Sequence, residues 1–218
     1  MVFTKRIYKR RKLLRKLGRK PRMYRRPSMG LVNVKRTVNL STLTLTSAWA
    51  GAMYNFTLGQ LPSSGDFTSM FSAYRINAIR LLFIPVITSL DGAQVYANQT
   101  AGSQWTTVPR LYTAIEKTGN GQYATEALIQ QYQNLRVIKR PLSPFTVYIK
   151  NPAVWESVQT TAASAFSQPR SKQWLSCDTT NVNHYGCAIG GILPGASASG
   201  SVQYNVIATY YVQFKNPR

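Results

Sequence analysis

The sequence predicts an all-β protein: an eight-stranded antiparallel jelly-roll sandwich with short helices in the connecting loops and a basic N-terminal arm. Apolar residues recur at every second position in about eight segments, as expected of half-buried antiparallel strands. Segments rich in Gly, Ser, Asn and Thr separate them, and basic residues are concentrated before the first segment. This number of strands fits a double-sheet jelly roll, although another sandwich or an open barrel would share it.

The arm is predicted from its charge. Between Met1 and Arg36 there are 15 Lys and Arg residues and no acidic residue, in a chain with a formal net charge of +21. Closely spaced like charges repel one another, so such a segment stays extended until a polyanion neutralises it. We therefore expect two parts, a basic arm at 1–30 and a jelly-roll domain at 31–218.

Nucleic acid is the polyanion that we expect the arm to bind, because each neutralised phosphate releases a condensed counterion. An anionic membrane and an unused solubilising tail are the alternatives. Lys and Arg contact phosphates without reading bases, so the binding is expected to tolerate any sequence and to weaken with salt. The predicted nucleic-acid-binding residues are Lys5, Arg6, Lys9, Arg10, Arg11, Lys12, Arg15, Lys16, Arg19, Lys20, Arg22, Arg25 and Arg26.

Other features of the arm suggest further roles. Tyr8 and Tyr24 lie among the charges and are candidates to stack on unpaired bases, or else to pack against the body. The run KRRK, Lys9–Lys12, matches a nuclear-import signal. Five apolar residues gather on one side of a helical wheel, which predicts a helix that forms on phosphates and can also disrupt membranes: Phe3, Ile7, Leu13, Leu14 and Leu17.

The strands of the body are predicted in order from their alternation. The first runs from Val32 to Leu45, with a β-bulge near Ser41 and Thr42, where the apolar positions change parity. The segment Arg75–Val86 is apolar on both parities, which is typical of a strand covered on both faces. The others span Tyr54–Leu58, Leu111–Ile115, Leu135–Val137, Phe145–Ile149, Tyr185–Leu193 and Val202–Phe214, the last being the most regular.

Two short helices are predicted between the strands. Asp66 is expected to cap a turn with apolar residues at helical spacing, namely Phe67, Met70, Phe71 and Tyr74. A second helix is expected over Tyr123–Gln133, with one side formed by Ala124, Ala127, Leu128 and Gln131.

The body offers few groups for chemistry. It has one histidine and six scattered carboxylates, and it lacks a glycine-rich phosphate loop, a nucleophile elbow and a zinc-protease motif. We therefore expect no enzyme, no cofactor and no metal. Cys177, His184 and Cys187 invite a zinc hypothesis, but their spacing matches no standard zinc site, so we expect buried thiols and a surface imidazole. No apolar run is long enough to span a membrane, and the N-terminus lacks the apolar stretch of a secretory signal.

Several segments resemble the capsid proteins of circovirus-like small circular single-stranded DNA viruses. An arginine-rich N-terminus directly precedes a β-domain. FSAYRINAIRLLFIP, Phe71–Pro85, is similar to the F-x-x-Y-R-I opening of a core strand in that family, and the final strand ends in YYVQFKN, Tyr210–Asn216. KQWLSC from Lys172 and HYG from His184 are similar to the late part of such capsids.

The resemblance implies a single jelly roll with sixty copies in a T=1 icosahedral shell, arms turned inward and loops outward. It implies a capsid protein of the virion whose partners are a circular single-stranded DNA genome and identical subunits. In a eukaryotic host it implies assembly in the nucleus and nuclear import receptors as partners, and no host receptor can be identified. The alternatives are the coat protein of a small RNA or satellite virus, and a basic ribosomal or chromatin-type protein.

Overall fold

The computed structural model describes residues 30–86, 108–119, 121, 123–161, 164–194 and 201–218, with the backbone alone for 156–161 and 164–168. The chain divides into two units, Met1–Leu31 and Val32–Arg218, and nearly all described residues belong to the second. The predicted nucleic-acid-binding residues, Lys5 to Arg26, lie outside the described residues, as do Tyr8 and Tyr24.

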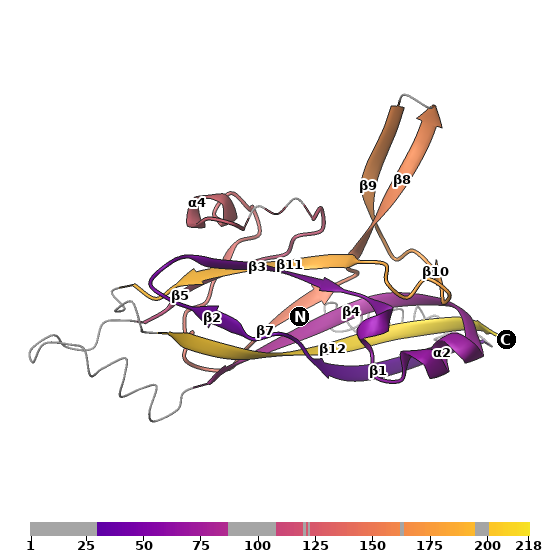
Figure 1. Cartoon of the computed structure of the whole chain (residues 1–218), viewed down its shortest axis with the longest axis horizontal. Helices are drawn as coiled ribbons and strands as arrows, with labels where there is room; N and C mark the ends of the chain where they lie inside the picture. The colour runs from indigo at the N-terminus through magenta and orange to yellow at the C-terminus, as the bar shows by residue number, and fades with distance from the viewer. Residues whose placement is uncertain (1–29, 87–107, 120, 122, 162–163, 195–200) are drawn as a thin grey trace, which may run out of the picture. The chain divides into compact units, whose positions relative to one another are not determined.

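Two six-stranded sheets form the second unit (Figure 1). In the first sheet the order is β1–β12–β4–β10, with β2 also paired to β12 and β7 to β4. Its strands are β1 (Leu31–Asn39), β2 (Leu43–Leu45), β4 (Phe71–Val86), β7 (Phe145–Lys150), β10 (Leu175–Ser176) and β12 (Val202–Pro217).

The second sheet has the order β6–β5–β11–β8–β9, with β3 paired to β11. Its strands are β3 (Ala50–Phe56), β5 (Arg110–Ala114), β6 (Arg136–Val137), β8 (Ala153–Thr161), β9 (Ser164–Ser171) and β11 (His184–Ile192). Apart from the β8–β9 hairpin, most neighbouring strands come from distant parts of the chain. The strand orders β1–β12–β4–β7 and β3–β11–β5–β6 make the sandwich a jelly roll. This confirms the predicted antiparallel jelly-roll sandwich, although the two sheets contain twelve strands instead of the eight predicted.

The core lies between the sheets and is rich in aromatic rings. Strand β12 buries every second residue from Tyr204 to Phe214. Rings from opposite sheets meet edge to face, Phe56 with Tyr210 at 5.9 Å and Tyr54 with Phe83 at 5.9 Å between centroids. The alternation read from the sequence therefore identifies the inner face of β12 correctly.

A close approach of the Trp49 side chain explains Gly190 of β11. A Cβ atom on Gly190 would lie 2.2 Å from the Cζ2 atom of Trp49. The indole therefore packs directly on the strand backbone at this point, which only glycine permits.

All eight predicted strands are present. The first is interrupted where the bulge was predicted and appears as β1 and β2, both paired to β12. Three strands were not predicted: β8, β9 and β10. The β8–β9 hairpin extends away from the two sheets (Figure 1), and β8 joins β11 only through the pairs His184↔Val154 and Tyr185↔Ala153.

The helix predictions are only partly correct. Helix α2 spans Ser64–Met70, with Ser63 rather than Asp66 at the N-cap position and Tyr74 already in β4. The expected helix over Tyr123–Gln133 is reduced to α4 (Glu126–Ile129), which begins after Thr125, whose side chain accepts a hydrogen bond from Leu128 N. Its buried residue is Ile129, not the predicted side of Ala124, Ala127, Leu128 and Gln131. A 3-10 helix, η1 (Leu58–Gln60), follows β3.

The prediction of a surface imidazole is wrong, because the β3–β11 pairing carries His184 into the core with 2% of its surface exposed. Its Nδ1 lies 3.0 Å from the carbonyl oxygen of Val182 and 3.1 Å from that of Phe56, so this nitrogen carries the donated proton. Both cysteines are free and buried, and burial raises the pKa of the Cys187 thiol to about 12. Within the described part of the chain, there is no group of three or more His, Cys, Asp or Glu side chains that could hold a metal ion.

Among the described helices, none has the length and apolar composition to cross a bilayer.

We predict that Tyr210→Asp prevents folding, because Tyr210 is fully buried and an unpaired carboxylate is costly in an apolar core. Tyr210→Phe should cost only about 1 kcal/mol, the value of the hydrogen bond that the phenol donates to Gln60. Circular dichroism during heating checks both variants. A folded Tyr210→Asp protein would show that the inner face of β12 is misassigned.

We also predict a loss of stability in acid that depends on His184. Burial lowers the pKa of His184 from 6.5 to about 4, although the two carbonyl contacts oppose this shift. Between these values the unfolded chain binds a proton that the folded chain excludes, so stability falls as the pH drops from 6.5 to 4, by about 3 kcal/mol in all. Urea unfolding across this range measures the loss. His184→Gln keeps a donor without a titration and should remove this part of the pH dependence; an unchanged pH profile would refute the assignment.

Candidate nucleic-acid interface

The first sheet contains no acidic residue in any of its six strands. Its strands carry six basic residues, in β1, β4, β7 and β12: Lys35, Arg36, Arg75, Arg80, Lys150 and Lys215. The strands of the second sheet carry three Arg and one Glu. The strands of the first sheet, which begins where the arm ends, therefore carry twice as many cationic side chains as those of the second sheet and no acid.

The strand register places several of these groups in two adjacent rows on the outer face of the sheet. Thr209 of β12 pairs with Arg80 of β4, which pairs with Tyr148 of β7. In the next row Tyr211 pairs with Ala78, which pairs with Lys150. Side chains on one face of neighbouring strands lie about 5 Å apart, so each row is a continuous surface.

Strand β1 extends both rows. The hydroxyls of Thr37 and Thr209 are 3.5 Å apart, and the Lys35 ammonium lies 6.0 Å from the ring centroid of Tyr211. Tyr148 and Tyr211 meet across the small Ala78, with ring centroids 6.4 Å apart and planes inclined by 65°. We call the surface of Lys35, Ala78, Arg80, Tyr148, Lys150, Thr209 and Tyr211 the basic aromatic face.

Trp174 lies at the end of the sheet between two cations. The guanidinium of Arg75 and the ammonium of Lys215 are each 4.6 Å from its ring. Arg75 also donates a hydrogen bond of 2.5 Å to Gln213. The indole thus holds two like charges close together by interactions with its π-electrons.

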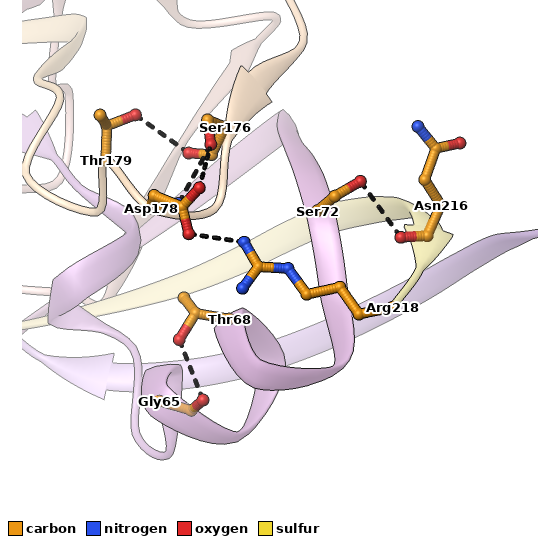
Figure 2. Close-up of polar contacts among 8 residues, drawn as sticks. All are labelled: Gly65, Thr68, Ser72, Ser176, Asp178, Thr179, Asn216 and Arg218. Atoms are coloured by element: carbon orange, nitrogen blue, oxygen red, sulfur yellow. Dashed lines mark hydrogen bonds and ion pairs between the residues drawn. The ribbon is translucent and has the colours of Figure 1, made fainter.

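One described carboxylate lies just beyond the end of the first sheet. Asp178 follows β10 and forms an ion pair with Arg218, in which Oδ1 of Asp178 lies 2.5 Å from Nη2 of Arg218 (Figure 2). The hydrogen bond from Arg218, a second hydrogen bond from the Ser176 hydroxyl and the positive charge of Arg218 lower the pKa of the Asp178 carboxyl. Asp178 is therefore neutralised by the last residue of the chain and does not offset the cations of the outer face.

A hollow of about 740 Å³ adjoins the basic aromatic face at Tyr148 and Lys150. It is lined by the loop after β5 and the loop after α4, and Lys117 donates a hydrogen bond to the carbonyl oxygen of Lys150 beside it. Its one carboxylate, Glu116, is only 3% exposed. Burial alone would raise the pKa of Glu116, but hydrogen bonds from Thr118, Tyr132 and Gly119 reverse this and hold it below its usual value.

The basic residues of the face were not predicted as site residues. Their signal is present in the sequence as Arg and Lys at outward positions of alternating strands, with no acid among them. Only the register of β4 with β7 and β12 shows that they share one surface with two tyrosines.

The family model described as Circovirus capsid protein matches residues 2–218. Among solved structures, the 60-mer of the BFDV capsid protein superposes with a TM-score of 0.63 at 16% identity, covering 85% of this chain and 94% of that one. The decameric BFDV capsid protein gives 0.54 at 15% identity, covering 85% and 99%. Melon necrotic spot virus gives 0.51 at 13% identity, covering 86% and 56%, and at these identities the likeness establishes the fold. No curated protein sequence matches the chain.

We predict that Trp174→Leu lowers the free energy of unfolding by about 1 kcal/mol through the loss of both cation contacts. Trp174→Phe keeps an aromatic face and should retain most of that stability. Urea unfolding of the two variants provides the comparison. Equal losses would mean that the ring contributes by packing alone.

Proposed function

The chain belongs to the circovirus capsid protein family, and from this premise we propose that sixty copies form an icosahedral shell that packages circular single-stranded DNA through the basic arm. Membership makes the chain a structural component of the virion and not an enzyme. The BFDV capsid protein, which has the same fold, forms a 60-mer. This supports the proposed copy number.

The observation that carries the proposal is the distribution of charge. Fifteen basic residues precede residue 37 without one acidic residue, and the sheet that starts at Leu31 continues without acids. Sixty such arms would neutralise on the order of a thousand phosphates, each giving up its counterion. The remaining phosphates of a longer genome would require the basic residues of the body and small cations.

The choice of DNA over RNA rests on the family. The jelly-roll architecture alone does not distinguish the two polymers. Treating purified particles with RNase or DNase after disruption, followed by sequencing, identifies the packaged nucleic acid. A ribosomal or chromatin-type role would instead give monomers on nucleic acid and no closed particles in negative-stain micrographs.

The arm also supports proposals about the host cell. We propose that Lys9–Lys12 is recognised by nuclear import receptors, which would bring the chain to the nucleus for assembly if the host is eukaryotic. The apolar residues of the arm, Phe3 to Leu17, would allow it to act on membranes during entry as well.

We predict that deleting Met1–Arg26 leaves the sandwich folded and lowers affinity for single-stranded DNA more than about a hundred-fold at moderate salt, because 13 of the 27 basic residues are lost. Fluorescence anisotropy measures the affinity, and circular dichroism verifies the fold. A full-length variant with the same 13 residues changed to Gln controls for chain length.

Two outcomes would contradict this division of labour. A truncated chain that cannot fold would show that arm and body are not separable. A truncated chain that binds as tightly as the full chain, with the same salt dependence, would show that the arm is not the main DNA contact.

A further inference from the structure

We propose that Tyr148 and Tyr211 stack unpaired bases of single-stranded DNA, while Lys35, Arg80 and Lys150 hold the phosphates. This inference rests on the proposed function and adds a second DNA site on the folded body, with a preference for unpaired strands. The arm would supply affinity mainly through its charges, and the basic aromatic face would add contact with the bases.

The accessibility of Tyr148 is the first support. The residue is 56% exposed although it lies on a strand of the sandwich, and its register partner on β4 is the charged Arg80. Large aromatic side chains usually bury most of their surface. An exposed ring among cations is the arrangement by which proteins bind single strands without sequence preference.

The geometry of the two rings is the second support. In an edge-to-face pair, only one face of one ring is covered by the partner, so the exposed ring of Tyr148 keeps a face for stacking. The centroids of Tyr148 and Tyr211 are 6.4 Å apart, about twice the ~3.4 Å rise per nucleotide of a stacked strand. If the strand is extended to about twice its stacked rise, two neighbouring bases lie as far apart as the two rings, and each base can contact one ring.

The positions of the cations are the third support. Lys150 pairs with Ala78 in the row of Tyr211, Arg80 pairs with Tyr148, and the Lys35 ammonium is 6.0 Å from the ring of Tyr211. Among the described residues, no carboxylate forms an ion pair with Lys35, Arg80 or Lys150. These charges are therefore available to phosphates on either side of a stacked base.

The hollow beside Tyr148 provides room for a base that leaves the sheet surface. Its size, about 740 Å³, lies in the range of small-molecule sites. Lys117 and Lys150 border it, and the carboxylate of Glu116 is turned to the donors of Thr118 and Gly119. Duplex DNA cannot use these rings, because its bases are stacked on one another inside the helix.

The test compares two probes on the full-length chain: oligothymidylate and an abasic oligomer of the same length. The arm binds phosphates of both, whereas stacking requires a base. We expect oligothymidylate to bind at least about five-fold more tightly. Tyr148→Leu should reduce this ratio to near one, and Tyr148→Phe, which keeps the ring, should restore it.

Matched variants distinguish the face from the rest of the body. Tyr185→Leu removes a half-buried tyrosine from β11 of the other sheet and should leave the ratio unchanged. Lys150→Gln should reduce the slope of log affinity against log salt by about 0.7, one phosphate contact on a single strand. Lys139→Gln, at an exposed position after β6, should leave this slope unchanged.

The outcomes separate this inference from the proposed function. If neither probe binds, DNA packaging by this chain is wrong. If both probes bind equally and Tyr148→Leu has no effect, the arm binds DNA but the stacking site is refuted. Photocrosslinking of assembled particles with 5-iododeoxyuridine DNA adds direct evidence: crosslinks at Tyr148 or Tyr211 support the site, and crosslinks confined to 1–30 overturn it.

Discussion

The antiparallel ladder between β4 and β12 is the constraint on which the rest of the structure depends. It runs from the pair Gln203↔Val86 to the pair Pro217↔Phe71, interrupted by one irregularity between Tyr211 and Val212. Because strand side chains alternate between faces, this single register sends Tyr204, Tyr210 and Phe214 into the core and turns Thr209 and Tyr211 outward. A slip by one residue would exchange the two faces and expose the aromatic core.

The same register gives the molecule two chemically different surfaces. Inside, aromatic rings of the two sheets interlock and hold the sandwich together. Outside, the first sheet presents basic and aromatic side chains, and its edge strand β1 continues directly from the polycationic arm. A capsid protein that packages nucleic acid, as we propose for this chain, requires a body that packs against copies of itself and a surface that tolerates a polyanion. One sheet without acidic residues supplies the second requirement within a fold that supplies the first.

The sequence predicts the local features of this fold well, because apolar and polar residues alternate visibly in segments such as Val202–Phe214. It fails where contacts between residues distant in the chain determine whether a side chain is buried or a strand forms. Pairing of β11 with β3 buries His184, which composition alone placed at the surface. The β8–β9 hairpin pairs mainly with itself through a segment rich in Ser, Thr and Gln, so it lacks the apolar alternation that marks a buried strand. The basic aromatic face escaped prediction for the same reason, because Lys35, Tyr148 and Tyr211 meet only through sheet register. The predicted arm residues, Lys5 to Arg26, stay predictions.

Electron cryomicroscopy of DNA-filled particles tests the central claim most directly, our proposal that the basic aromatic face of the first sheet contacts the packaged genome. We expect the outer face of β4 and β12 to line the interior, with nucleotide density against Tyr148 and Tyr211 that is missing from empty particles. Finding this face on the exterior of the shell, or covered by a neighbouring subunit, would contradict the account.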